Sequence, residues 1–132
     1  MATDRSACGC CEWRGMLVVC GGRGGAGEPL CSVEAFDGRE WRSLPDMSAD
    51  RLGPALAVVN GVMHAIGGVC DNGQSSGGWG AHGGGAPANA EPFTAEVERY
   101  DPDAEEWVAC PHMKAPVAYH ACFAAGLAPL YD

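Results

Sequence analysis

The residues of this 132-residue chain that could hold a metal ion are a cysteine cluster and four scattered histidines. Cys8, Cys10 and Cys11 form the cluster, and thiolates are favoured ligands of Zn²⁺. A closed zinc site needs four ligands, usually as two separated pairs, and the other candidates are scattered along the chain. We therefore predict neither a metal nor a cofactor. The cluster is expected to belong to a disordered, cysteine-rich tail over residues 1–15.

Patterns that could support catalysis are equally weak. The histidines are His64, His82, His112 and His120, and their spacing is that of no metal site. His64 and His120 fall in strand-like segments, which favours a place in the core or along a channel over a role as a base. Residues 91–106 contain seven carboxylates and one arginine. We interpret them as a solvated strand edge and turn, where charge discourages edge-to-edge pairing.

A glycine-rich segment resembles a dinucleotide-binding sequence. Residues 22–27 read Gly-Arg-Gly-Gly-Ala-Gly, which fits G-x-G-x-x-G and follows an apolar run. A dinucleotide site also needs a helix that begins there and directs its N-terminus at the pyrophosphate. Residues 28–33 lead into another strand-like run instead. The match is therefore interpreted as a glycine-rich loop, and the chain is predicted not to be an enzyme.

The composition excludes several classes of partner. With 20 glycines and 9 prolines the chain does not suit a helical bundle, and short strands joined by turns fit better. Its net charge of −9 disfavours nucleic acid and anionic membrane surfaces. The first residues lack the order of a secretory signal, so a cytoplasmic location with reduced thiols is expected. Cysteines in or beside strand-like runs, which we expect to be small buried residues, are Cys20, Cys31, Cys110 and Cys122.

A hairpin is the most clearly predicted element. Residues 57–68 read as two apolar strands joined by Asn60-Gly61, and they end on the pair Gly67-Gly68. Asn-Gly between apolar runs is a strong hairpin signal, because a tight turn needs two residues that tolerate positive φ. Both strands are apolar at almost every position. This pattern predicts burial on both faces.

The end of this hairpin recurs earlier in the chain. The apolar run 16–20 ends on Gly21-Gly22, and the two glycine pairs are 46 residues apart. The first pair is followed by Val33-Glu34-Ala35-Phe36-Asp37, Trp41, Pro45 and Met47, and the second by Val97-Glu98-Arg99-Tyr100-Asp101, Trp107, Pro111 and Met113. An order of residue types that returns intact indicates a structural repeat.

The repeat divides the chain after the tail into three segments. The first repeat covers residues 16–53 with three strands, the second covers 54–113 with four, and a third begins over 114–132. The second repeat contains 18 additional residues after its glycine pair. This inserted loop, residues 69–92, consists mainly of glycine, serine and alanine, so we predict that it is mobile.

These residues resemble the kelch repeat, a propeller-blade motif of about 50 residues. Its signature is a glycine pair that ends the second strand, Tyr-Asp on the third strand and a tryptophan that opens the fourth. The matching residues are Gly21, Gly22, Phe36, Asp37 and Trp41, and then Gly67, Gly68, Tyr100, Asp101 and Trp107. The resemblance covers about residues 16–131. It implies an all-β fold, an incomplete kelch-type β-propeller of about two four-stranded antiparallel blades.

The most similar subset is the kelch part of BTB-kelch proteins, because residues 97–102 followed by Trp107 and residues 111–113 are typical of it. This similarity implies a protein-interaction module for substrate recognition in an adaptor of a cullin-RING ubiquitin ligase, here without BTB or BACK segments. The sequence departs from the family at His64, where an aromatic residue is usual. It departs again at Val117, near the place that would repeat Arg51.

Partner contacts are expected in the loops at one face of the propeller, because binding residues gather in loops on a rigid scaffold. The candidates are Arg23, Arg51, Trp79 and His82. For Arg51 a structural role that ties one blade to the next is the alternative. Trp79 and His82 are the only large side chains of the inserted loop.

Two other functions remain open. The chain could be an actin-binding or scaffolding kelch protein, or a fragment of a kelch-propeller enzyme, whose active site would draw on several blades. A propeller closes with typically about 4–8 blades, so two blades alone would leave their outer faces exposed to solvent. The chain is then either a fragment of a longer protein or a unit that assembles with copies of itself to complete a propeller.

Overall fold

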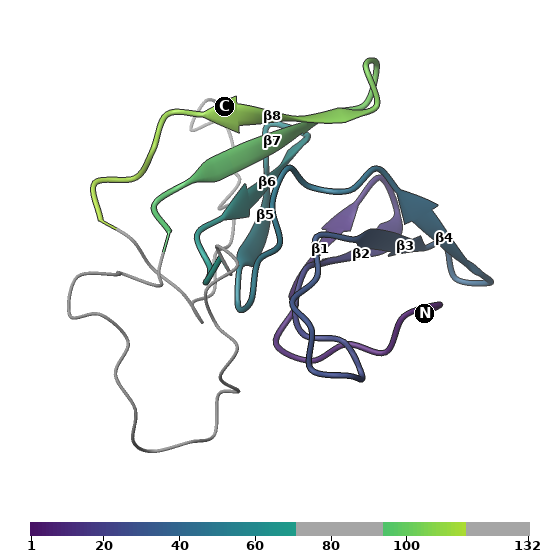
Figure 1. Ribbon diagram of the computed structural model, residues 1–132. Helices are drawn as coiled ribbons and strands as arrows, with labels where there is room; N and C mark the ends of the chain where they lie inside the picture. The colour runs from purple at the N-terminus through teal and green to yellow at the C-terminus, as the bar shows by residue number, and fades with distance from the viewer. Residues whose placement is uncertain (71–93, 116–132) are drawn as a thin grey trace, which may run out of the picture.

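The computed structural model describes residues 1–70 and 94–115, and the regular elements in these ranges are β-strands. The first sheet contains β1 (Gly9–Trp13), β2 (Met16–Cys20), β3 (Val33–Phe36) and β4 (Trp41–Leu44). The second contains β5 (Ala55–Val59), β6 (Val62–Ile66), β7 (Val97–Asp101) and β8 (Glu106–Cys110). Both sheets are antiparallel with strands in chain order, and we call them blade 1 and blade 2 (Figure 1). The prediction of about two four-stranded antiparallel blades is confirmed.

The start of the chain corrects one prediction. Residues 1–15 were expected to form a disordered tail, but Gly9–Trp13 is strand β1, paired with β2 from Gly9↔Cys20 to Trp13↔Met16. The expectation was wrong because these residues lack the continuous apolar run by which a strand is recognised in a sequence. They form a strand because pairing with β2 satisfies their backbone N–H and C=O groups. Blade 1 therefore has four strands, and not the three that were predicted.

The predicted hairpin is present as β5 and β6, with Val59 paired to Val62. Its turn residues Asn60 and Gly61 have φ angles of 51° and 79°. The same turn joins β1 to β2 at Arg14 and Gly15, 46 residues earlier, where φ is 52° and 77°. Burial on both faces is observed only at the start of β5, where Ala55, Leu56 and Ala57 are all buried. Val59 at the end of β5 is 45% exposed, and β6 alternates between buried and half-buried residues. One face of blade 2 contacts blade 1, which explains the alternation.

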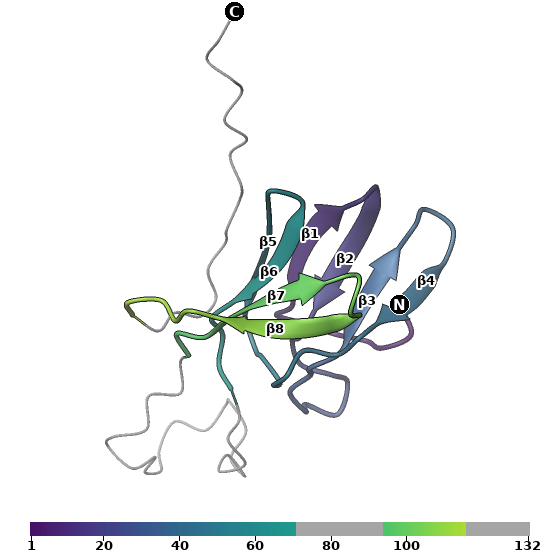
Figure 2. The same ribbon diagram turned by 90° about the horizontal axis from the view of Figure 1, so that it is seen from above.

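The core lies between the two blades. Its members from blade 1 and the following connection are Trp13, Met16, Val18, Cys20, Val33, Ala35 and Met47, and those from blade 2 are Leu56, Met63, Ala65, Tyr100 and Trp107. The strands β1 and β5 contact one another, and Figure 2 shows them side by side. At Gly9 a side chain would crowd this contact, since a Cβ at this position would lie 3.0 Å from the Pro54 carbonyl oxygen and 3.2 Å from the Cβ of Leu56.

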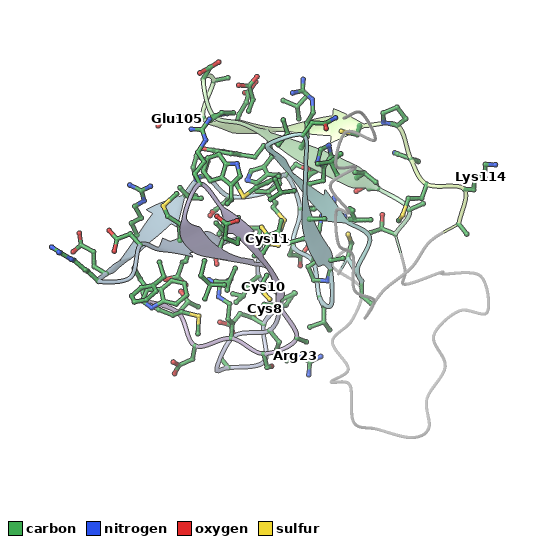
Figure 3. All side chains as sticks on the ribbon, turned by 180° about the vertical axis from the view of Figure 1, so that it is seen from behind. Cys8, Cys10, Cys11, Arg23, Glu105 and Lys114 are labelled. Carbon is green, nitrogen blue, oxygen red and sulfur yellow. The ribbon has the colours of Figure 1, made fainter. Side chains whose placement is uncertain are left out.

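Antiparallel pairing sorts the connections into two ends. The turns β1–β2, β3–β4, β5–β6 and β7–β8 share one end, which we call the hairpin end. The opposite end, called the loop end, holds residues 1–8, the β2–β3 connection (21–32) and the β4–β5 connection (45–54). The end of β6 and the start of β7 also lie there. Figure 3 shows Glu105 at the hairpin end and Arg23 at the loop end.

Some predictions fall outside these ranges. Most of the inserted loop 69–92 and most of the third repeat 114–132 lie outside the described residues, and the repeat boundaries stay predictions. The described part of the chain offers no helix with the length and apolarity needed to span a bilayer.

Candidate functional site

Arg51 joins the two blades at the loop end. Its backbone is held in blade 1, where the N–H donates to the Leu30 carbonyl at 3.0 Å and the carbonyl accepts from the Gly22 N–H at 2.7 Å. Its side chain is 0% exposed and points into blade 2. There Nη1 donates to the Gly67 carbonyl at 2.9 Å, and Nη2 lies 3.5 Å from Glu98 Oε2. Arg51 is therefore a tie between blades, which its position favours over direct contact with a partner.

The carboxylate of Glu98 completes this cluster. Glu98 is 3% exposed, and its Oε1 accepts hydrogen bonds from the hydroxyl and the backbone N–H of Ser48. Glu96 adds a second carboxylate 3.6 Å from Arg51 Nη2. A buried guanidinium needs such partners, because an unpaired buried charge is very costly.

The same cluster occurs in blade 1, around Arg5. Arg5 Nη1 donates to the carbonyls of Gly21 and Ser32, both at 3.0 Å, and Nη2 lies 2.6 Å from Glu34 Oε2. The backbone N–H of Ala2 donates to Glu34 Oε1 at 2.7 Å, in the place that Ser48 takes in blade 2. Arg5 precedes Arg51 by 46 residues, so the segment before each blade docks onto it in the same way.

Sequence reasoning missed Arg5 and Glu34 as partners, because the first residues were placed in a tail. The signal was available in the repeat period. Subtracting 46 residues from Arg51 gives Arg5, just as subtracting 46 from Gly67 gives Gly21. The two copies differ at the position two residues before the buried glutamate. This position is Ser32 in blade 1, before Glu34, and Glu96 in blade 2, before Glu98.

The Glu34 carboxyl has a pKa below its ordinary value. Burial would raise this pKa, but the N–H of Ala2 and the guanidinium of Arg5 outweigh burial and stabilise the carboxylate. A carboxyl whose pKa is lower in the folded than in the unfolded chain stabilises the fold at neutral pH. This contribution is complete above the ordinary glutamate pKa of about 4.3 and is lost as the pH falls through the lower, folded value.

We therefore expect the difference in unfolding free energy between the wild type and Glu34→Gln to shrink on acidification. At pH 7 the wild type is the more stable, because the variant leaves Arg5 buried without its carboxylate. As the pH falls below the ordinary glutamate pKa of about 4.3, the unfolded wild type takes up a proton that the folded chain does not, so the difference between the two chains shrinks until the folded Glu34 is protonated as well. Urea unfolding at pH 7, 5, 4 and 3 measures the difference. A difference that stays constant over this range would show that Glu34 is not the group that titrates.

The glycine pairs let the linking segments approach the blades. Gly21 and Gly22 have φ angles of 61° and 93°. A Cβ on Gly21 would lie 2.5 Å from the Arg51 carbonyl oxygen, and a Cβ on Gly22 would lie 2.4 Å from that of Ser6. In the second pair, a Cβ on Gly68 would lie 3.2 Å from the Leu52 carbonyl oxygen. These positions require glycine for both its backbone angles and its lack of a side chain.

The aromatic residues of the repeat pack within and between the blades. Phe36 and Trp41 stack with ring centroids 5.1 Å apart, and Tyr100 and Trp107 are 5.4 Å apart. Tyr100 also meets Trp13 of blade 1 edge to face at 5.7 Å.

The indole N–H groups cross the interface in opposite directions. Trp13 Nε1 donates to the Gly61 carbonyl at 2.9 Å, and Trp107 Nε1 donates to the Pro45 carbonyl at 2.9 Å. Each blade therefore supplies one donor and one acceptor to the contact.

The aspartates after the aromatic residues bind turn backbone. Asp37 Oδ1 accepts from the N–H groups of Arg39 and Glu40, at 2.8 and 3.0 Å. Asp101 Oδ1 likewise accepts from Asp103 and Ala104. These side chains hold the β3–β4 and β7–β8 turns.

Arg23 lies in a loop at the same end as Arg51. Its backbone pairs with Ser6 through hydrogen bonds of 2.8 and 3.0 Å, while the residue as a whole is half-buried. Beyond it, Gly24 donates to the Glu28 carbonyl at 2.8 Å, so residues 23–29 form a hydrogen-bonded loop and no helix begins there. This agrees with the interpretation of the G-x-G-x-x-G match as a loop. Trp79 and His82 lie outside the described residues.

The thiols and histidines of the described residues lie in the two blades and in the segments that flank or connect their strands. Burial raises the pKa of Cys20 to about 12, and burial also raises that of Cys11 to about 12, so both thiols stay protonated at neutral pH. Figure 3 shows Cys8, Cys10 and Cys11 near one another along the start of blade 1. Within residues 1–70 and 94–115, no three His, Cys, Asp or Glu side chains gather in a way that could hold a metal ion. His64, which was expected in the core or a channel, is half-buried.

Known proteins share this sequence pattern and this fold. The kelch motif family model matches residues 4–48. Kelch-like protein 8 of Caenorhabditis elegans is 45% identical over 56 residues, which cover 41% of this chain and 8% of that protein. Kelch-like protein 34 of Homo sapiens is 29% identical over 99 residues, which cover 72% of this chain and 14% of that protein. The chain thus spans only a small part of the curated relatives it matches.

A solved structure shows the same arrangement of blades. The structure of YjhT superposes with a TM-score of 0.68 at 20% sequence identity, covering 86% of this chain and 40% of that chain. At this identity the likeness concerns the fold alone. Together with the family match at residues 4–48 and the two kelch-like relatives, the paired blades show that this chain is a kelch repeat protein.

Proposed function

We propose that this chain is a protein-interaction module that binds its partner through the loop end. We further propose that it serves in the cytoplasm as the substrate-recognition part of a cullin-RING ubiquitin ligase adaptor. The observation that carries the proposal is the loop of residues 23–29, exposed at its tip and anchored at its base. Loops held on a rigid sheet scaffold are the usual place of binding residues.

The anchoring of this loop supports binding with little loss of entropy. Arg23 is paired through its backbone to Ser6, and Leu30 donates to the Gly22 carbonyl at 2.9 Å, which closes the base of the loop. A loop that is already ordered loses less conformational freedom when a partner binds. Arginine is also one of the residue types that dominate interface hot spots.

The charged groups beneath the loop end favour binding over catalysis. Arg5, Glu34, Arg51 and Glu98 are buried and paired with one another or with backbone carbonyls. Groups occupied in this way hold the scaffold and are not available to a substrate as acids or bases. This supports a surface that recognises a partner by contact.

The ligase role rests on the resemblance to the kelch part of BTB-kelch proteins, and two relatives named as kelch-like proteins support that resemblance. The matched segments cover only 8% and 14% of those proteins. The partner of this chain is then a ligase substrate, and the full adaptor would supply the contact with the cullin.

Proximity labelling in cells tests the proposal with two matched arginine variants. Arg23→Ala removes the candidate side chain at the loop end, and Arg39→Ala removes an exposed arginine from the β3–β4 turn at the hairpin end. We expect Arg23→Ala to reduce labelling of the partner about tenfold, the size of a modest hot spot, and Arg39→Ala to leave it unchanged. The labelled partner should accumulate when cullin activation is blocked. Equal loss in both variants would refute the loop-end site, and direct co-sedimentation of the chain with actin filaments would refute the ligase role.

A further inference from the structure

The contact between the blades joins two different faces. Because side chains alternate along a strand, each blade has two faces. Blade 2 contributes the face that carries the Tyr100–Trp107 pair, which we call the aromatic face. Blade 1 contributes the other side of its sheet, the opposite face, which includes Val18 and Ala35. The contact is therefore head to tail, and the aromatic face of blade 1 and the opposite face of blade 2 take no part in it.

The aromatic face of blade 1 repeats the residue types that are buried in blade 2. Phe36 and Trp41 form the stacked pair in the place of Tyr100 and Trp107, but both are only half-buried. Leu17 stands 46 residues before Met63 and is 45% exposed, whereas Met63 is 0% exposed. This face therefore has the composition of an interface and remains open to solvent among the described residues.

The opposite face of blade 2 differs from its buried counterpart in charge. His64 and Arg99 are cross-strand partners, and they stand where blade 1 has Val18 and Ala35, which are both 0% exposed. Arg99 is exposed, and Val59, the counterpart of Trp13, is 45% exposed. A purely apolar partner would leave Arg99 buried without compensation.

The exposed parts of these two faces complement one another in chemistry, while Ala55 and Ala57 on the opposite face of blade 2 are buried. In the contact within the chain, Val18 and Ala35 share one cluster with Tyr100 and Trp107. The same geometry between copies would place His64 and Arg99 against Phe36 and Trp41. A guanidinium over an aromatic ring is attracted by the ring, most strongly by tryptophan.

A carboxylate adds to this match. Glu12 is exposed on the aromatic face of blade 1, 46 residues before Val58, which packs against the core cluster in blade 2. Where blade 2 has Val58 on its aromatic face, blade 1 has Glu12. Where blade 1 has Ala35 on its opposite face, blade 2 has Arg99, so the two replacements introduce charges of opposite sign. The charges that distinguish the two open faces from the buried contact are therefore of the kind that attract.

We propose that copies of this chain associate head to tail, with the aromatic face of blade 1 in one copy seated on the opposite face of blade 2 in the next. Such a contact continues until a ring closes. Setting the two described blades of each copy against the about 4–8 blades of a propeller gives a ring of two to four copies. The contact uses the flat faces of the blades and not the loop end, so it is separate from the proposed partner site.

Light scattering coupled to size-exclusion chromatography tests the association over about 1–100 μM protein. We expect the wild type to form one discrete species of two to four 13.6 kDa chains. Leu17→Glu alters the aromatic face of blade 1, and Arg99→Glu alters the opposite face of blade 2. Each should weaken association more than about tenfold. Leu17→Glu removes an apolar side chain whose counterpart, Met63, is 0% exposed in the contact between the blades, and Arg99→Glu replaces the attraction to Glu12 by repulsion. Arg39→Glu, which makes the same charge change at an exposed turn, should assemble like the wild type.

A mixture of the two variants provides the decisive measurement. Each variant keeps one intact face, so a head-to-tail contact predicts a 1:1 heterodimer of Leu17→Glu with Arg99→Glu and nothing larger. This result also shows that both variants are folded. A wild type that stays monomeric at every concentration would overturn the proposal. Failure of the mixture to form a heterodimer would overturn it as well, even if the wild type associates.

Discussion

Replacing Arg51 by alanine is expected to lower the free energy of unfolding by about 3–5 kcal/mol, the usual effect of breaking a buried ion pair. The Arg51 side chain is 0% exposed and that of Glu98 is 4% exposed, so the change leaves a carboxylate buried without its cation. It also removes the donor to the Gly67 carbonyl. Urea unfolding followed by tryptophan fluorescence measures the loss.

Two further variants separate the ion pair from other effects. Arg39→Ala, at an exposed turn, is expected to change stability by less than about 0.5 kcal/mol. The double variant Arg51→Met with Glu98→Met removes both charges and should recover much of the loss, because apolar residues of similar size can replace a buried pair. If Arg51→Ala behaved like Arg39→Ala, Arg51 would not hold the blades together.

Alanine at Gly22 is expected to be far more damaging than alanine at Gly27. The two glycines have nearly the same backbone angle, with φ of 93° and 89°. A Cβ at Gly22 would lie 2.4 Å from the Ser6 carbonyl oxygen, whereas no described atom lies within 4 Å of a Cβ at Gly27. Gly27→Ala should cost about 1–2 kcal/mol from the backbone angle alone. Gly22→Ala adds a collision with backbone, so we expect at least about 2 kcal/mol more.

The comparison isolates the close approach, since the cost of the angle is common to both variants. Thermal unfolding of the two variants beside the wild type gives the difference directly. Equal losses would mean that the glycine pair is required for its φ angles only. They would also mean that the segment containing Ser6 can move away from blade 1 without penalty.

The repeat period was the most informative feature of the sequence. It predicted which strand each glycine pair ends and which strands carry the aromatic residues, because each of these positions needs a particular residue type. The Asn60-Gly61 turn was predicted for the same reason, and its φ angles of 51° and 79° agree. These features depend on local chemistry and can be recognised in one sequence.

The first strand could not be recognised from its own residues. In β1 the side chains of Cys10 and Glu12 are exposed and Cys11 is half-buried, so Gly9–Trp13 has no clear apolar pattern. Its place is determined by pairing with β2 and by contact with β5, which are long-range interactions. Only the period of 46 residues, applied backwards from the second hairpin, would have predicted it.

The candidate site was predicted in part. Arg51 was identified with both of its possible roles open, and its complete burial favours the structural one. Arg5 was missed together with β1. Arg23, Trp79 and His82 stay proposed partner contacts. The sequence of one chain does not specify the surface of its partner.

Two indole N–H protons test most directly whether the two blades form one unit. Trp13 donates to Gly61 across the contact in one direction, and Trp107 donates to Pro45 in the other, each at 2.9 Å. Hydrogen exchange followed by NMR is expected to show both protons protected to the same degree as the amides in the middle of β2 and β6, because the contact then opens only when the chain unfolds. Rapid exchange of both indole protons, with the strand amides still protected, would show that the blades separate freely and would contradict the structure of this chain as two joined kelch blades.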